Sequence, residues 1–251
     1  MTDASAPTYA LHFPQRETDE VAQDDEYVHV ELDGGKREIR FHDYSEIYAE
    51  PGLYEQLFYD ELDCQSPAVV VGELAQHVDD PATLRVLDVG AGNGMVGERL
   101  RDLGVAHLVG VDIIEAAAAA TERDRPGIYD DYLIADLTAL SAEDNTKLAA
   151  GGFDAMVTVA ALGFGDIPPE AFAVAFNHVA DGGLVGLTIK EDFLAEGDFA
   201  GFVRRLDEDG AMRILSRRRY LHRRSVTGEE LYYVAVIAEK CRDIALRSSS
   251  R

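Results

Sequence analysis

The sequence is poor in basic residues, in cysteine and in long apolar runs. Lys and Arg number 23 against 47 Asp and Glu, giving a formal net charge of −24. Phosphate backbones and anionic membrane surfaces repel such a chain, so we expect it to bind neither nucleic acid nor a membrane. No apolar run approaches the roughly 20 residues of a membrane span, and the N-terminus lacks the features of a signal peptide. These absences predict a soluble, cytoplasmic protein.

Cysteine and histidine are too few and too scattered for a metal site. Cys64 and Cys241 form no CxxC pair, which argues against a disulfide scaffold and a structural zinc. The seven histidines form no HExxH motif or other ligand cluster, so we expect no metal. Lysine occurs only at positions 36, 147, 190 and 240. This acidic, Lys-poor composition suits a high-salt cytoplasm, but a GC-rich genome gives the same Arg bias.

The chain is long enough for one large domain with a small extension. Apolar residues make up 47% of its 251 positions, which supports a sizeable core. Alternating apolar residues flank Asp33-Gly34-Gly35, predicting a β-hairpin; a Tyr-rich helical stretch follows at 43–63. We predict a loosely ordered acidic arm at 1–26, an N-terminal hairpin and helical cap at 27–80, a core at 81–242 and a tail at 243–251.

From residue 84 short apolar runs alternate with helical patterns. Because each run is continuously apolar, the pattern predicts a mostly parallel sheet covered by helices on both faces. The last two runs have no helix between them, so one of these strands should be antiparallel. The predicted strands are LRVLDVG, HLVGVDII, DYLIADL, FDAMVTVAAL, LVGLTIK, residues 212–222 and residues 231–239. In such a doubly wound α/β fold, ligands bind at the carboxyl ends of the strands.

The first of these strands ends in the glycine-rich turn Gly90-Ala91-Gly92-Asn93-Gly94. Such a turn lets a ligand approach the backbone, and both dinucleotides and S-adenosylmethionine use it. Asp88 favours the second class, because a carboxylate repels a pyrophosphate but attracts an ammonium group. Asp112 closes the next strand, where it can accept ribose hydroxyls. Asp136 closes the third strand and could accept from an adenine amino group.

With these motifs the stretch from about residue 84 to 240 resembles a class I S-adenosylmethionine-dependent methyltransferase. The resemblance lies in the segments VLDVGAGNG, VGVDII, IADL, FDAMVTVAAL and DGGLVGLTIK. It extends to the methyltransferase-like proteins of the Williams–Beuren region. It implies a Rossmann-like sheet of seven strands with an antiparallel last strand. The implied cofactor-binding residues are Tyr48 on a lid, Asp88, Gly90, Ala91, Gly92, Asn93, Gly94, Asp112, Ile113, Ala135, Asp136, Leu137, Val159 and Ala160.

The methyl acceptor is less well defined by the sequence. Sulfonium methyl transfer needs mainly positioning and exclusion of water. The segment after the fourth strand lacks the [N/D]PP[Y/F] pattern of enzymes that methylate amino groups of nucleic acids and glutamine, so we expect a small-molecule acceptor. Leu162 and Phe164 suit such an acceptor, and an arginine stripe at 213–224 could recognise an anionic one. Candidate substrate residues are Tyr54, Leu162, Phe164 and Arg224, with His222 as a candidate base.

Other functions stay open at this stage. They are a protein methyltransferase, a scaffold that binds the cofactor without catalysis, and an NAD(P)-dependent reductase. Asp88 and the absence of a Tyr-x-x-x-Lys pair argue against the reductase. The acceptor atom and the oligomeric state are not determined by the sequence.

Overall fold

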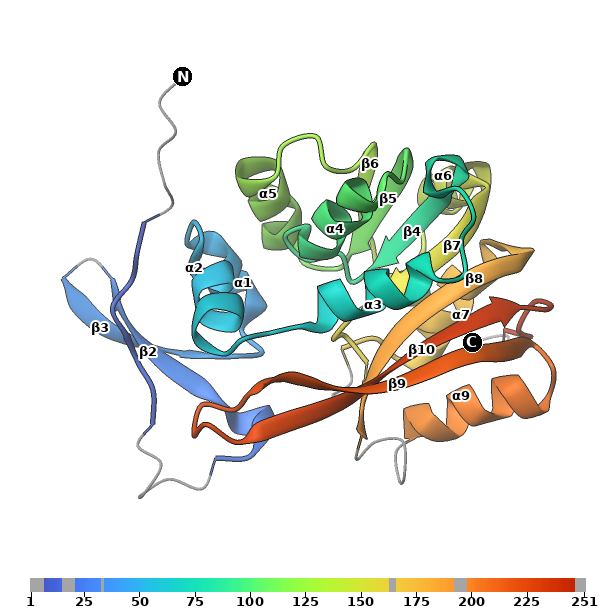
Figure 1. The fold of residues 1–251 in the computed structure, drawn as a ribbon. Coiled ribbons are helices and arrows are strands. Elements are labelled where there is room, and N and C mark those ends of the chain that lie inside the picture. Colours follow the sequence, from blue (N-terminus) through green and yellow to red (C-terminus); the bar gives the residue numbers. More distant parts are fainter. Residues whose placement is uncertain (1–6, 15–20, 33, 163–165, 192–197, 247–251) are drawn as a thin grey trace.

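The computed structural model describes residues 7–14, 21–32, 34–162, 166–191 and 198–246. A large twisted sheet forms the centre, helices cover both of its faces, and a smaller sheet stands beside it (Figure 1). The alternation of apolar strands with amphipathic helices explains this layered arrangement, because each strand must be covered on both sides.

The large sheet contains seven strands in the order β6-β5-β4-β7-β8-β10-β9. The β4–β5, β5–β6, β4–β7 and β7–β8 pairs are parallel, whereas β10 is antiparallel to both β8 and β9. This confirms the predicted fold class and the antiparallel last strand. The strands are β4 (Arg85–Val89), β5 (His107–Asp112), β6 (Asp131–Ile134), β7 (Phe153–Thr158), β8 (Val179–Lys190), β9 (Met212–Arg224) and β10 (Glu230–Lys240).

Two buried clusters hold the helices against the sheet. One contains Phe172 and Phe176 of α7, and the other contains Val70 and Leu74 of α3. Helix α3 packs against β8 and β10, although the expected boundary at residue 80 places it with the cap. The helices are α3 (Ser66–Ala75), α4 (Met95–Leu103), α5 (Glu115–Asp124), α6 (Ala142–Gly151), α7 (Pro169–Asn177) and α9 (Asp198–Glu208), with single 3-10 turns η3 (Pro81–Thr83) and η4 (Leu137–Ala139).

The smaller sheet and three short helical segments form the cap, which we define as residues 27–61. The hairpin pairs β2 with β3, and its apolar face is buried. This face consists of Val28, Val30 and Ile39. Val226, from the loop between β9 and β10, completes this cluster and joins the cap to the core. The elements are β1 (Leu11–His12), β2 (Tyr27–Leu32), β3 (Gly35–Arg40), α1 (Tyr44–Ala49), α2 (Leu53–Glu55) and the π-helical turn η2 (Gln56–Glu61).

The N-terminal arm is more ordered than we predicted within its described residues. Strand β1 pairs with β2, and the 3-10 turn η1 (Gln23–Asp25) leads to Glu26. Glu26 is fully buried, bonds to Arg223 and accepts a hydrogen bond from the Val226 backbone N–H at 2.7 Å. A buried carboxylate needs such partners, so the contact fixes the arm against the core.

The arginine stripe lies on β9, the edge strand of the large sheet. Arg218 pairs with Glu73 at 3.0 Å, and Arg219 pairs with Glu191 at 2.7 Å. Charged side chains paired with local acids are a common way to protect an exposed edge. Arg218 and Arg219 fit that role, and recognition of an anion by the stripe stays a prediction. Within the described ranges, each helix is too short or too polar to cross a bilayer.

Candidate cofactor and acceptor site

The strand ends that the sequence singled out converge on one cavity of about 340 Å³. Strands β4, β5 and β6 are parallel neighbours, so the residues that follow them meet at the same edge of the sheet. The described residues lining this cofactor cavity are Tyr44, Tyr48, Tyr54, Val89, Gly90, Val111, Asp112, Ile113, Ile114, Ala135, Asp136, Leu137, Thr138, Val159, Ala160, Ala161, Asp166, Ile167, Pro168 and Ala171.

Asp112 connects the glycine turn to the end of β5. Its Oδ2 accepts a hydrogen bond from Gly92 N–H at 2.9 Å, and its Oδ1 accepts one from Ile114 N–H at 2.9 Å. Burial raises the pKa of this carboxyl, although the backbone hydrogen bonds oppose that shift. Each oxygen keeps a further lone pair, so the carboxylate can still accept hydroxyl groups from a ligand.

Beside Asp112, the cavity wall consists of the apolar Ile113 and the carboxylate of Asp136. Ile113 is 62% exposed, which is unusual for a large apolar side chain beside a cavity and suits the face of a flat ligand. Asp136 follows β6, and its Oδ1 accepts hydrogen bonds from the N–H and hydroxyl of Thr138. These bonds lower the pKa of Asp136 and keep it ionised.

Tyrosines of the cap close the cavity from the opposite side. Tyr48 is buried, and its ring centroid lies 5.0 Å from that of Tyr54. A Cβ built on Gly92 would come within 2.6 Å of the Tyr48 hydroxyl. The backbone of Gly92 also has a φ of +54°. Glycine at position 92 therefore permits both the turn and the close approach of Tyr48.

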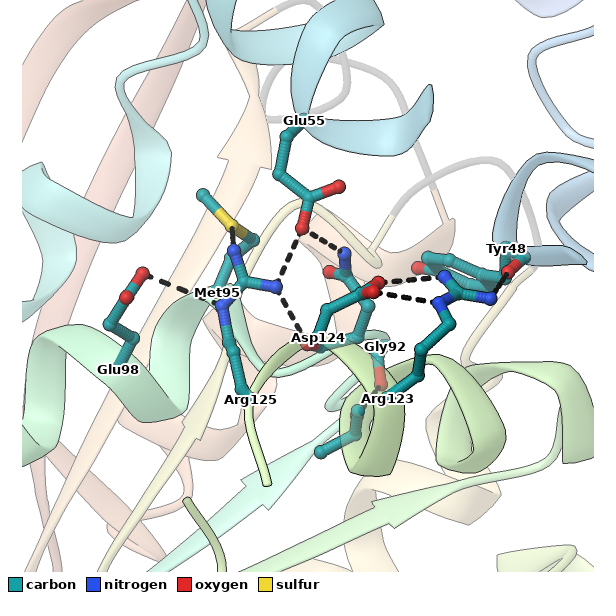
Figure 2. Close-up of polar contacts among 10 residues, drawn as sticks. Tyr48, Glu55, Gly92, Met95, Glu98, Arg123, Asp124 and Arg125 are labelled. Atoms are coloured by element: carbon teal, nitrogen blue, oxygen red, sulfur yellow. Dashed lines mark hydrogen bonds and ion pairs between the residues drawn. The ribbon is translucent and has the colours of Figure 1, made fainter. Parts of the chain in front are cut away.

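A polar cluster ties the cap to the glycine turn (Figure 2). Arg125 follows α5, and its Nη1 donates to Glu55 Oε1 at 2.6 Å and to Asn93 O at 3.1 Å. The Asn93 side-chain amide donates to the same Glu55 oxygen at 2.8 Å. Nearby, Arg123 donates to Tyr48 O at 3.1 Å. The cap residues over the cavity are thus held by two arginines of one helix end.

A second cavity of about 80 Å³ lies between the cap, the glycine turn and the end of β9. It shares Tyr44, Tyr48, Tyr54, Gly90, Val159, Ala160 and Asp166 with the cofactor cavity, so the two meet at the ends of β4 and β7. The remaining described lining residues are Gln23, Phe41, His42, Phe58, Tyr59, Cys64, Pro67, Ala91, Gly92, Asn93, Met95, Val96, His222, Arg223 and Tyr233. We refer to this space as the inner cavity.

His222 is held firmly in the wall of the inner cavity. Its Nδ1 lies 2.6 Å from the Ser66 hydroxyl, which lies 2.6 Å from the Tyr220 hydroxyl. The imidazole also stacks on Tyr233, with ring centroids 3.9 Å apart. Burial, and then the charge of Arg223, lower the pKa of His222 well below its usual range. The imidazole is therefore neutral at physiological pH.

Asp88 lies behind the glycine turn rather than in a cavity wall. It is 1% exposed, its Oδ2 accepts a hydrogen bond from the Tyr129 hydroxyl at 2.7 Å, and its Oδ1 has no partner. It lines neither cavity, and its expected contact with the amino group of a cofactor stays a prediction. Burial is the main cause that raises the pKa of this carboxyl to about 7.

Three further predicted residues lie away from the cavities. Gly94 begins α4 and packs against the Arg125 side chain, and Leu162 is buried in the core. Arg224 is exposed, 3.7 Å from Glu230, whereas its neighbour Arg223 lines the inner cavity. The register of β9 against β10 shifts at His222, so His222 and Arg223 both line the inner cavity whereas Arg224 does not. Phe164 lies outside the described residues.

The sequence analysis missed several lining residues that come from distant segments. Gln23 belongs to the arm and Phe41 to the cap. Cys64 lies in the segment before α3, and Tyr233 lies on β10. No local motif marks them. Tyr44 carried a visible signal, because it lies four residues before Tyr48 and so on the same helical face.

The model of a methyltransferase domain family matches residues 65–231, more than half of the chain. The chain belongs to this methyltransferase family. The matched region is a methyltransferase domain, the class for which the sequence analysis expects S-adenosylmethionine as the cofactor. The cap precedes the matched region.

One relative shares part of the sequence of this chain, and two solved structures share its fold. Human methyltransferase-like protein 27 is 33% identical over 132 residues; the match covers 50% of this chain and 49% of the relative, so the chain spans about half of that protein's length. A TehB-like SAM-dependent methyltransferase from Corynebacterium glutamicum has a TM-score of 0.53 and 16% identity, covering 78% of this chain and 98% of its own. A proposed RNA methyltransferase from Pyrococcus horikoshii also has a TM-score of 0.53, at 15% identity, with 74% and 83% covered.

The cofactor cavity fits S-adenosylmethionine. Its volume suits a ligand of that size. The exposed face of Ile113 matches an adenine ring, and Asp112 offers lone pairs at the position expected for ribose hydroxyls. Because Gly90 also lines the inner cavity, a ligand can extend past the glycine turn toward it.

Proposed function

We propose that the protein transfers a methyl group from S-adenosylmethionine to a small molecule bound in the inner cavity. One observation carries this proposal: the inner cavity is covered by the cap and adjoins the cofactor cavity at Val159 and Ala160. The tyrosines of the cap cover this junction, which favours a small acceptor over a folded macromolecule. The net charge of −24 further disfavours RNA.

The bound cofactor supplies a methyl group already activated on a sulfonium, so the residues of the chain mainly orient and exclude water. Asp112, Ile113 and Asp136 hold the adenosine end. Gly90 to Asn93 hold the methionine end, and because these residues also line the inner cavity, the acceptor shares that cavity with it. Ala160 has a φ of +56°, and its N–H donates to Thr188 Oγ1 at 2.7 Å. This bond fixes a strained turn at the junction of the two cavities.

His222 is the group that we propose to receive the proton released by the acceptor. Its low pKa makes it a weak base. A weak base is sufficient for a proton that becomes strongly acidic only as the new bond to the methyl carbon forms. For His222 to accept at Nε2, its Nδ1–H must donate to Ser66, and the 2.6 Å contact permits this.

A screen with labelled cofactor tests the proposal. Purified protein is incubated with S-adenosylmethionine carrying a labelled methyl group and a cell extract separated into small molecules, protein and RNA. We expect label in the small-molecule fraction, and no transfer by the Asp112→Ala variant. Transfer to protein or RNA instead would overturn the choice of acceptor. Binding of S-adenosylhomocysteine without transfer to any fraction would favour a non-catalytic role.

A further inference from the structure

The junction of the two cavities is the position that the covalent structure of the cofactor assigns to its sulfur. In S-adenosylmethionine this sulfur joins the adenosyl group to the methionine chain, so it lies between the residues that hold these two ends. Asp112 lines only the cofactor cavity, whereas Ala91 and Gly92 line only the inner cavity. A cofactor held at both ends therefore has its sulfur, the atom that bears the positive charge, at the junction.

Asp166, shortly before α7, carries a charge at this junction. Among the described residues that line both cavities, it is the one with an ionisable acidic side chain. Burial, followed by the charge of Asp166, raises the pKa of Tyr44 in the cap. Burial is also the main cause that raises the pKa of Asp112, and the charge of Asp166 adds to that rise. The carboxylate of Asp166 therefore acts on the space between the cap and the end of β5.

The surroundings of Asp166 leave its charge available to a ligand. His42 Nδ1 lies 3.9 Å from its Oδ1, which is beyond hydrogen-bond distance, and an imidazole compensates a carboxylate only when it is protonated. The described residues of the cofactor cavity include Asp112 and Asp136 but no Lys, Arg or His. Burial raises the pKa of Asp166, against the opposing effect of His42, so this carboxylate has lost part of its hydration. A positive charge at the junction would compensate that loss.

We propose that Asp166 recognises the positive charge of the cofactor's sulfonium, so that the site binds S-adenosylmethionine more tightly than S-adenosylhomocysteine. Methyl transfer removes this charge, and the product thereby loses the attraction that held the substrate. Because the charge is present before the reaction, the contact favours exchange of product for fresh cofactor and does not itself accelerate methyl transfer. The inference rests on the proposed function in taking S-adenosylmethionine as the cofactor, and it is independent of the acceptor.

Calorimetric titration of the full chain with three ligands tests the inference. They are S-adenosylmethionine, S-adenosylhomocysteine and sinefungin, in which a carbon bearing an ammonium group replaces the sulfonium. The titrations are made at about pH 8.5, where histidine side chains are largely neutral and His42 does not compensate Asp166. An opposite charge nearby shifts such equilibria by about tenfold or more, and 32% exposure of the Asp166 side chain favours the lower figure. We expect both cationic ligands to bind about tenfold more tightly than S-adenosylhomocysteine.

Variants of Asp166 separate this preference from folding and from net charge. Asp166→Asn keeps the shape of the side chain and should lower the preference at least about threefold, with the Kd for S-adenosylhomocysteine within about twofold of the wild-type value. Asp166→Glu keeps the charge and should retain most of the preference. Asp102→Asn removes the same charge at an exposed position and should leave the preference unchanged. In the wild type, about 0.5 M salt should reduce the preference by screening.

The outcomes distinguish the two proposals. Wild-type protein that binds S-adenosylhomocysteine as tightly as S-adenosylmethionine, or a preference that is the same after Asp166→Asn, overturns the inference about Asp166. An equal fall in Asp102→Asn also overturns it, because the preference would then come from the net charge of the chain. If neither adenosyl ligand binds, both proposals fail. Transfer of label to protein or RNA alone overturns the proposed acceptor, whatever the ratio of the two affinities.

Discussion

The carboxylate of Glu55 lies 2.6 Å from the guanidinium of Arg125 and links α2 of the cap to the end of α5. The same Glu55 oxygen accepts from the amide of Asn93 in the glycine turn. The cluster in Figure 2 therefore connects the cap with the glycine turn, the loop that we propose to hold the cofactor. One carboxylate thus contributes both to the position of the cap and to the shape of the turn.

Removing that carboxylate should loosen the cap. We expect Glu55→Ala to lower the free energy of unfolding by roughly 2 kcal/mol, because Arg125 and Asn93 each lose a charge-assisted hydrogen bond in a largely buried place. Dissociation of S-adenosylhomocysteine, followed by stopped-flow fluorescence, should become faster. Glu143→Ala breaks an exposed pair with Lys147 and serves as the control, with an expected change below about 0.5 kcal/mol. Equal effects of the two substitutions would contradict the proposed connection.

Gly92 should tolerate a methyl group poorly for two separable reasons. Gly92→Ala adds backbone strain of about 1 kcal/mol at a left-handed φ, and its Cβ would meet the Tyr48 hydroxyl at 2.6 Å. Gly210→Ala has a similar φ of +69° with nothing within 4 Å and so measures strain alone. We expect the larger loss of stability in Gly92→Ala, with partial recovery on adding Tyr48→Phe. Chemical denaturation of the single and double variants measures these differences; no recovery in the double variant would mean that the hydroxyl is not the obstacle.

The pKa of Asp88, about 7 in the folded chain, should make its contribution to stability depend on pH. Since the folded value lies above the unfolded value of 3.8, the folded state binds the proton more tightly between these limits. The contribution is fully present below pH 3.8 and declines as the pH rises toward 7. Asp88→Asn should remove this decline, visible as a flatter curve of unfolding free energy against pH. Asp102→Asn, at an exposed side chain, should leave the curve as in the wild type.

Loss of the Asp112 carboxylate should weaken cofactor binding strongly. Asp112→Ala removes the acceptor for Gly92 N–H and for Ile114 N–H and the lone pairs directed at the ribose. We expect the Kd for S-adenosylhomocysteine to rise at least about tenfold, corresponding to about 1.4 kcal/mol. Calorimetric titration measures it, with Asp102→Ala as the matched control. An unchanged Kd would exclude Asp112 from the cofactor site.

The sequence alone determined the sheet, the glycine turn and the cofactor edge of the site. These features depend on local patterns, because apolar runs form strands and the residues after parallel strands converge. The same patterns predict that Asp112, Ile113 and Asp136 lie together, and all three line the cofactor cavity. The antiparallel last strand followed from the missing helix between β9 and β10.

Tertiary structure decided which side chains form the inner cavity. Gln23 and Tyr233 are 210 positions apart and meet only because the arm folds back onto β10. Arg223 rather than Arg224 lines the cavity, together with its neighbour His222, because the register of β9 against β10 shifts at this point. Asp88 was recognised from its motif, but its burial against Tyr129 depends on packing across the sheet. Contacts between distant segments are set by the packing of the whole chain, and no local pattern encodes them.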